Sequence, residues 1–385
     1  MPKIIRKAVA ISDLHLGQKE SILNPRFFPR SNLEKLAEQI DSLRKVDELI
    51  IVGDFMDFSL SSLREAYQNA RDFFGIIGKL HSVEEIVYLP GNHDHHLWLE
   101  LVENEEVIEK VKQGHIPLPM DQYVDKLVDR SFGDKSKEIF LDSLLPQRND
   151  GTKMKLKVKY PHHFRSFGKE KRYYLFTHGH YLEDLFKPVD VLLEPGFLAE
   201  LEAFNCLWLE GLWYHMGQSG RFGQLIESIF NDLIKGKTEI ASSLIANIVN
   251  LIEKKYQVFW LKIPFVKKLA NGYLRKKLKA IGLKKRADLA GSPIDNKQKL
   301  RIQGYIEKFV LNRYHPTQNR KQIPTPFTFV YGHTHRYFEG ETLNVNGQTY
   351  DLVNTGGWLE GEAKDNAGML VIEKEEHSWI SFFHG

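Results

Sequence analysis

Short apolar, β-branched runs that alternate with helix-like stretches dominate the N-terminal part of the chain. Residues 7–12 (KAVAIS), 48–53 (ELIIVG) and 85–89 (EIVYL) are such runs, and residues of about 32–44 and 61–80 between them have a helical pattern. Continuous apolar runs joined by helices are typical of parallel strands that are buried on both faces. The sequence therefore predicts an α/β fold.

Strand-like patterns return further along the chain. After a helical stretch at about 94–147, with a break at 116–119, residues 153–160 and 173–177 predict a hairpin whose turn is the charged stretch 168–172. Further strands are expected at 325–331, on either side of Asn346-Gly347 within 343–353, at 369–372 and at 379–383. Asn-Gly is a strong signal for a two-residue hairpin turn.

The stretch 183–321 interrupts this pattern and is predicted to be mostly helical. We therefore divide the chain into a sheet-based body, residues 1–182 and 322–385, and a helical, basic insertion, residues 183–321. From Lys235 to Lys321 there are 21 Lys and Arg residues but only 5 Asp and Glu residues, although the net charge of the whole chain is +3. A basic segment on an otherwise acidic body indicates an anionic partner of its own.

Residues 262–285 form the most distinctive part of the insertion. Apolar side chains recur there at three- and four-residue spacing, and Lys or Arg fills much of the remainder. A basic amphipathic helix beside the bulky apolar residues 258–261 is suited to an anionic membrane surface, so we expect such a contact through 235–285. Packing of the apolar stripe on its own domain, a dimer contact, and the less expected binding of nucleic acid are the alternatives. The oligomeric state stays open.

Composition excludes several classes of protein. Hydrophobic residues make up 42% and charged residues 27% of the chain, which is ordinary for a globular protein. The single cysteine, Cys206, excludes an internal disulfide and a cysteine-based zinc site, and it favours a reducing compartment. The sequence has neither a long apolar run nor a signal-peptide pattern. We expect a cytoplasmic protein, associated peripherally with a membrane through 235–285.

Five short segments place metal-binding side chains directly after strand-like runs. They are residues 13–15 (DLH), 53–57 (GDFMD), 91–94 (GNHD), 178–180 (HGH) and 332–335 (GHTH). Open α/β sheets bind ligands at the carboxyl ends of their strands. Carboxylate, imidazole and amide groups together suit a divalent metal such as Mn, Fe or Zn.

In their order these segments match the motif series D-x-H, G-D-x-x-D, G-N-H-[DE], H-G and G-H-x-H, and the chain resembles the calcineurin-like metallophosphoesterases. The resemblance covers about 1–180 and 322–385 and leaves the insertion outside. It implies an α/β sandwich of two mixed sheets flanked by helices. It also implies a phosphohydrolase with a binuclear metal centre.

The resemblance gives each motif residue a role. One divalent ion is expected to bind Asp13, His15, Asp54 and His335, and the other is expected to bind Asp54, Asn92, His178 and His333, with Asp54 as the bridge. His93 is the expected catalytic group that donates to the phosphate or protonates the leaving oxygen, and Asp57 is expected to orient it.

Several residues near the motifs have other expected roles. Asp94 is expected to be structural, and His180 is an alternative ligand to His178, which holds the motif position. His95, His96, His162 and His163 match no motif position, and we expect them at the surface or lining the pocket.

The resemblance implies hydrolysis of a phosphoester or pyrophosphate by in-line attack of a metal-activated hydroxide. Mn²⁺ is the expected ion, with Fe, Zn, Mg and Ni as alternatives. The first and last motifs are also similar to those of the UDP-diacylglucosamine pyrophosphatases of lipid A synthesis. The expected substrate is lipid-linked or nucleotide-linked. A nuclease or cyclic-nucleotide phosphodiesterase, and a non-catalytic scaffold on the same fold, are the alternatives.

Overall fold

The computed structural model describes residues 5–117, 140–168, 171–182, 209–215, 218, 294, 296–307 and 325–384. The chain forms two compact units, one of Met1–Gln218 and Asp295–Gly385 and the other of Ser219–Ile294. Most of the expected helical insertion, 183–321, lies outside the described residues, and its basic segment, 235–285, lies wholly outside them. The elements named below all belong to the first unit.

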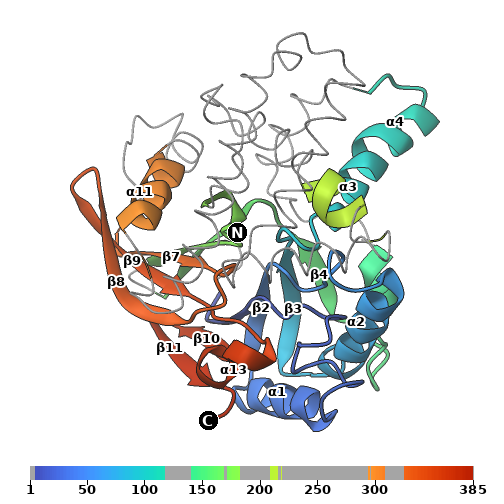
Figure 1. Ribbon diagram of the computed structural model, residues 1–385, viewed down its shortest axis with the longest axis horizontal. Coiled ribbons are helices and arrows are strands. Elements are labelled where there is room, and N and C mark those ends of the chain that lie inside the picture. The colour runs from blue at the N-terminus through green and yellow to red at the C-terminus, as the bar shows by residue number, and fades with distance from the viewer. Residues whose placement is uncertain are drawn as a thin grey trace, which may run out of the picture. The chain divides into compact units, whose positions relative to one another are not determined.

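The first sheet contains the apolar runs of the N-terminal part of the chain. Among the described residues it has six strands in the order β11-β10-β1-β2-β3-β4 (Figure 1). They are β1 (Lys7–Ile11), β2 (Val46–Val52), β3 (Val83–Leu89), β4 (Lys155–Val158), β10 (Gly368–Glu373) and β11 (Glu376–Ser381). The parallel pairing of β1 with β2 and of β2 with β3 confirms the prediction from their continuous apolar runs.

The second sheet has five strands among the described residues, in the order β5-β6-β7-β9-β8. They are β5 (His162–Phe167), β6 (Arg172–Thr177), β7 (Phe327–Tyr331), β8 (Phe338–Val345) and β9 (Gln348–Asn354). The turn between β8 and β9 is the expected one, because Asn346 and Gly347 both have positive φ, at 51° and 80°. β6 and β7 pair in parallel, so their carboxyl ends lie at the same edge.

An apolar core lies between the two sheets. It contains alternate residues of the first sheet, such as Ala10, Ile50 and Val87, together with residues of the second sheet such as Phe176 and Val330. Successive side chains of a strand point to opposite faces, so the residues between these face away from the second sheet. Both faces of β1, β2 and β3 are therefore buried, which explains their continuous apolar runs.

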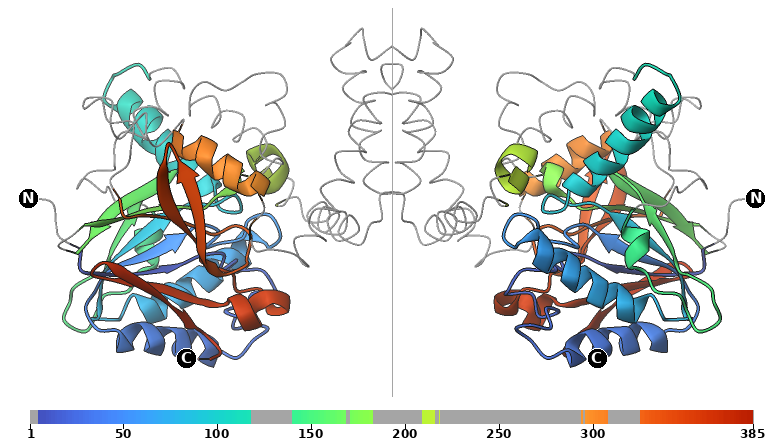
Figure 2. Two further views of the ribbon diagram at one scale, coloured as in Figure 1. Left: turned by 90° about the vertical axis from the view of Figure 1, so that its left-hand side faces the viewer. Right: turned by 90° about the vertical axis from the view of Figure 1, so that its right-hand side faces the viewer.

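Two helices cover the outer face of the first sheet. α1 (Ser31–Ser42) and α2 (Leu63–Ile77) run along it, so that helices, first sheet and second sheet form successive layers (Figure 2). The Ser62 side chain caps α2 by accepting a hydrogen bond from the backbone N–H of Glu65. This layering confirms the expected sandwich of two mixed sheets with flanking helices.

The other described helices are short. They are α3 (His96–Glu103), a π-helical turn (Asn104–Ile108), α4 (Glu109–Lys112), 3₁₀ turns at Phe140–Leu144 and His180–Leu182, a π-helical turn at Leu209–Tyr214, α11 (Asn296–Tyr305) and α13 (Glu360–Asn366). The helix expected from about residue 94 is present as far as Lys112, and residues 118–139 lie outside the described part. Within the described part, no helix has the length and apolar character needed to cross a membrane.

One expected strand pairing is wrong. β6 does pair antiparallel in a hairpin, but its partner is β5, whose Phe167 lies opposite Arg172, and not the alternating stretch 153–160. That stretch supplies β4, which pairs with β3 in the first sheet. The chain passes from one sheet to the other between β4 and β5, at Tyr160-Pro161, where proline has no N–H to continue a ladder. Short alternating runs do not specify which sheet they join.

Candidate metal centre

The motif residues follow the ends of five strands. Asp13 and His15 follow β1, Asp54 follows β2, Asn92 and His93 follow β3, His178 follows β6, and His333 and His335 follow β7. Parallel pairing brings the carboxyl ends of β1, β2 and β3 to one edge of the first sheet, and those of β6 and β7 to one edge of the second. The two edges meet, because the His333 backbone N–H lies 3.0 Å from both carboxylate oxygens of Asp13.

The backbone is strained at most of the expected ligands. Positive φ angles occur at Asp13 (54°), His15 (46°), Asp54 (48°), His333 (69°) and His335 (56°). This left-handed conformation costs an L-residue about 1–2 kcal/mol. Hydrogen bonds between loops hold it, including Asp13 N–H to Gly53 O at 3.0 Å and His15 N–H to Asp54 O at 2.9 Å. Such strain tends to collect at functional sites.

Two motif glycines leave room for the carboxylates. A Cβ on Gly91 would collide with Oδ1 and the backbone nitrogen of Asp54, and a Cβ on Gly332 would collide with Asp13 and Ser12. Both glycines are therefore required for close approach of the loops.

Asp13, His15, Asp54 and His335 form what we call the first group, in which each residue offers a ligand atom within 4.8 Å of the others. His335 Nε2 lies 3.4 Å from Asp13 Oδ1 and 3.0 Å from His15 Nε2. His15 Nε2 in turn lies 3.7 Å from Asp54 Oδ2. Only His335 is appreciably exposed.

Asp54, Asn92, His178 and His333 form the second group. His178 Nε2 lies 3.2 Å from Asp54 Oδ2, 3.0 Å from Asn92 Oδ1 and 3.3 Å from His333 Nδ1. Asp54, His178 and His333 meet the same 4.8 Å limit. Asp54 belongs to both groups, and its Oδ2 lies between His15 and His178.

The chemistry of both groups fits divalent cations. Buried imidazole nitrogens and carboxylate oxygens converge without apolar side chains between them, as metal ligands do. Burial alone would raise the pKa of Asp54, but His178 and His93 hold it well below its usual value. The site therefore presents an ionised carboxylate at the place where the two groups meet.

A third cluster links His93 to the first group. Asp57 Oδ2 lies 2.9 Å from His15 Nδ1 and 3.1 Å from His93 Nδ1, and Ser59 Oγ lies 2.5 Å from His93 Nδ1. Burial would lower the pKa of His93, but the carboxylates of Asp57 and Asp54 raise it to about 9. Asp57 thus contacts one expected ligand and the expected catalytic histidine at once.

Asp94 braces the loops that carry the site. Its carboxylate accepts hydrogen bonds from the backbone N–H groups of Gly91 at 2.7 Å, Phe55 at 2.7 Å and Met56 at 3.1 Å. These contacts join the loop after β3 to the loop after β2, in keeping with a structural role.

Two of the remaining histidines contradict the expectation of surface or pocket-lining positions. His163 is buried between the sheets, with Nε2 3.0 Å from Glu48 Oε2, and Arg165 binds the same carboxylate. His162 is also buried, with Nδ1 3.1 Å from the hydroxyl of Tyr305 in α11. Buried polar partners satisfy both rings, which removes the cost of placing them in the interior.

His95, His96 and His180 lie near the site but outside both groups. His95 is buried and His96 is half-buried, and their Nδ1 atoms lie 3.2 Å and 2.6 Å from the two carboxylate oxygens of Glu210. His180 is buried, with its ring centroid 5.6 Å from that of His178. Among the described residues it belongs to no group able to hold a metal, whereas His178 does.

Three side chains that the sequence did not single out contact the site or the histidines beside it. They are Ser59 beside His93, Glu210 beside His95 and His96, and Glu362, whose Oε2 lies 3.2 Å from His335 Nδ1. Glu210 falls in the stretch 183–321, and Glu362 lies on α13, beyond the last motif. None of them is part of a motif, so only the fold reveals these contacts.

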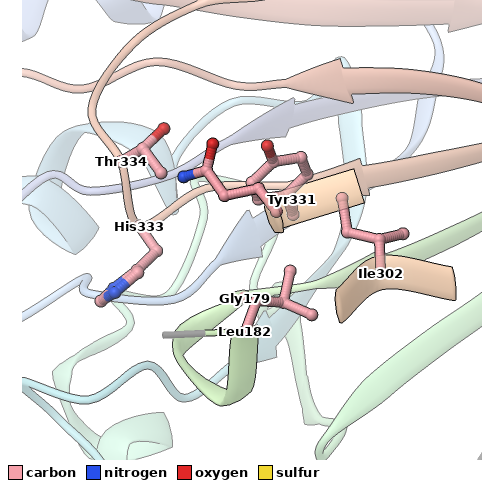
Figure 3. A pocket seen from close by; sticks show the side chains of 7 residues that line it. Gly179, Leu182, Ile302, Tyr331, His333 and Thr334 are labelled. Carbon is pink, nitrogen blue, oxygen red and sulfur yellow. The ribbon is translucent and has the colours of Figure 1, made fainter. Parts of the chain in front are cut away.

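A small pocket opens beside His333 (Figure 3). Gly179, Leu182, Ile302, Tyr331 and Thr334 line it together with His333 and Gln298. Its volume is about 10 Å³, which is enough for about one water molecule. In this form it does not admit an organic part of a substrate.

Comparison with known proteins agrees with the geometry. The family model described as calcineurin-like phosphoesterase matches residues 6–197. The matched part includes every candidate ligand from Asp13 to His178, and the fold adds His333 and His335 from outside it. No curated protein matches the chain.

Proposed function

Because the chain belongs to the calcineurin-like phosphoesterase family, whose members are metal-dependent phosphoesterases, we propose that it hydrolyses a phosphoester or pyrophosphate with two divalent ions held side by side. The single observation that carries this proposal is the position of Asp54, whose Oδ2 lies 3.7 Å from His15 Nε2 and 3.2 Å from His178 Nε2. A carboxylate shared in this way can bridge two ions.

The first group would hold one ion and the second group the other. Two divalent ions at such positions lower the pKa of a water molecule and neutralise charge on the attacking and leaving oxygens of a phosphoryl group. Asn92 contributes a ligand oxygen that carries no charge. The second group with its ion would therefore be more positive, and attract an anionic substrate more strongly, than if a carboxylate stood at this position. We propose Mn²⁺ as the ion, with Fe, Zn, Mg and Ni as alternatives.

His93 would act on the substrate and Asp57 would orient it. His93 Nδ1 is directed toward Asp57 and Ser59, so Nε2 would be the ring nitrogen that acts on a bound phosphate. From there it can donate a hydrogen bond to the phosphate or a proton to the leaving oxygen.

A lipid-linked or nucleotide-linked phosphoester or pyrophosphate is the substrate class we propose. The surplus of Lys and Arg in the segment 235–285 supports it. Peripheral contact with an anionic membrane in the cytoplasm is part of the same proposal. A nuclease or cyclic-nucleotide phosphodiesterase is the second candidate, since the same basic segment suits a phosphate backbone. A non-catalytic scaffold is disfavoured because all seven expected ligand residues and His93 are present.

Hydrolysis of a chromogenic phosphodiester and its monoester with Mn²⁺ tests the proposal. We expect activity in the wild type and none in Asp54→Asn, with Asp41→Asn as the matched control because Asp41 is exposed on α1. Bound metal without activity on either ester would direct the search to lipid-linked pyrophosphates. Absence of both activity and bound metal would contradict the proposal and favour the scaffold.

Binding assays on the full chain separate the two substrate classes. Co-sedimentation with vesicles that depends on anionic lipid would support a membrane substrate. Binding to single-stranded DNA with a steep dependence on salt, and none to vesicles, would support the nuclease.

A further inference from the structure

His15 and His335 of the first group differ from His178 of the second in the partner that the Nδ1 atom of each ring contacts. In the first group each ring has a carboxylate on its Nδ1 side: His15 Nδ1 is hydrogen-bonded to Asp57 Oδ2 at 2.9 Å, and His335 Nδ1 is in ion-pair contact with Glu362 Oε2 at 3.2 Å. In the second group His178 Nδ1 lies 3.0 Å from the backbone carbonyl oxygen of Val52. The nitrogens on the opposite side of these three rings face the proposed ions.

This difference affects ligand strength. A carboxylate at Nδ1 keeps the proton there, fixes the orientation of the ring and makes the opposite nitrogen a stronger donor to a metal. A neutral carbonyl fixes the tautomer but adds no negative charge. The first group also has two carboxylates of its own, Asp13 and Asp54, whereas the second has only Asp54.

The position of Glu362 is built into the fold. Asn366, the last residue of α13, fastens this helix to two loops. Its side-chain oxygen accepts a hydrogen bond at 2.8 Å from the N–H of Tyr337, in the loop after β7, and its backbone oxygen accepts one at 3.1 Å from the N–H of Gly357, in the loop after β9. Gly357 permits the close approach, because a Cβ there would lie 2.8 Å from His335 Cβ. The Glu362 side chain is 35% exposed, but its Oε2 atom, which faces His335, is buried.

We propose that Glu362 is a positioning residue for His335 and that it makes the first group the tighter of the two metal positions. The inference rests on the proposed function, since it requires two ions per chain. It assigns Glu362 no contact with substrate: it acts only through the His335 ring.

Calorimetric titration of the metal-free full-length protein with Mn²⁺ tests this. The wild type should bind two ions with unequal affinities. Asn92→Ala, which removes a ligand of the second group alone, should weaken the looser event and thereby assign the tighter one to the first group. Glu362→Gln should weaken the tighter event by about 10- to 100-fold, the range found for partners of metal-bound histidines, and leave the looser event unchanged.

Two further variants serve as controls. Glu360→Gln removes an exposed carboxylate from the same helix and should change neither affinity. Glu362→Asp keeps the charge and should restore part of the loss. The thermal unfolding midpoint of each metal-free variant shows whether the substitution damages the fold. If Glu362→Gln lowers this midpoint, the metal affinity of Glu362→Asp is used to test the inference instead.

The outcomes separate the inference from the function. Unchanged affinities in Glu362→Gln, or a loss confined to the looser event, would overturn the role of Glu362 while the metal centre stands. A wild type that binds no ion would overturn the proposed function itself.

Discussion

The Nε2 atoms of His15 and His335 lie 3.0 Å apart, although 320 residues separate them in the chain. Two imidazole nitrogens at this distance must share a proton or a cation. Burial lowers the pKa of His15; the hydrogen bond to Asp57 opposes this, but His93 and His335 lower the pKa further, so that it lies below its usual value and an added proton is disfavoured there. A divalent ion is therefore the better partner for the pair.

Metal removal should accordingly destabilise the protein. The strained ligand loops and the facing histidines belong to the folded state alone, so an ion that binds them stabilises folding. At a free Mn²⁺ concentration about 100 times the dissociation constant, the gain is about 2.7 kcal/mol per site. Thermal unfolding with and without a chelator measures it, and Asp54→Asn should show a much smaller difference. Equal midpoints for loaded and stripped wild type would contradict the metal centre.

His93→Ala should slow hydrolysis by about 10²- to 10⁴-fold and leave metal content intact, because the residue donates to substrate and not to the ions. Elemental analysis beside kinetics checks both parts. Asp57→Asn provides the contrast: it should lower both rate and metal affinity, since Asp57 also contacts His15. Loss of metal from His93→Ala would show that His93 is a ligand.

Gly91→Ala should disrupt the bridge between the two groups. The added Cβ has no space beside Asp54, so either the carboxylate or the loop must shift. We expect loss of activity and of at least one bound ion. Gly75→Ala in α2 is the matched control, because nothing lies within 4 Å of a Cβ there and alanine favours a helix by about 0.5–1 kcal/mol. Similar effects of both variants would exclude the steric argument.

The contact of the segment 209–215 with His96 should weaken in alkali. Burial lowers the pKa of His96, but Glu100 and Glu210 raise it to about 9. The ring of Tyr214 stacks on the ring of His96, and Glu210 also contacts His95. A histidine whose pKa is raised by folding stabilises the folded state. This stabilisation is complete at pH values below the unfolded pKa of 6.5, and it is lost as the pH rises through about 9. Hydrogen exchange of residues 209–215 should accelerate over that range beyond the intrinsic rate, and Glu210→Gln should remove the dependence. A pH-independent protection factor in the wild type would contradict the assignment.

Glu48 should contribute to stability down to low pH. Burial would raise its pKa, but His163 and Arg165 lower it to about 2, so its stabilisation is present above pH 4.5 and is lost as pH falls toward 2. Glu48→Gln leaves the guanidinium of Arg165 without its charge partner and should cost about 2–3 kcal/mol at neutral pH. Chemical denaturation measures this, with Glu38→Gln on the exposed side of α1 as control. A cost below that of the control would show that the pair is not stabilising.

The sequence predicted those site residues that directly follow a strand. Asp13, Asp54 and Asn92 each follow a buried parallel strand, and such strands end together, so their meeting follows from the pattern itself. Glu362 and Glu210 could not be found in this way, because each contact depends on how a distant segment packs. His163 was misplaced for the same reason: its partner Glu48 lies 115 residues away, on another sheet.

The pairing of β4 was missed because alternation gives the faces of a strand but not its neighbours. Only the crossing between β4 and β5 decides which sheet each joins. The boundaries of β1, β2 and β3 were nearly right because the polar motif residues end each apolar run.

The ligands come from loops of both sheets, and the last of them follow β7. During synthesis on the ribosome, a chain that has emerged as far as the residues just after β6 carries Asp13, His15, Asp54, Asn92 and His178 but lacks His333 and His335. Such a nascent chain cannot complete either group. Hydrolytic competence should therefore arise only after β7 has joined the second sheet, so that incomplete chains are harmless to phosphate esters in the cell.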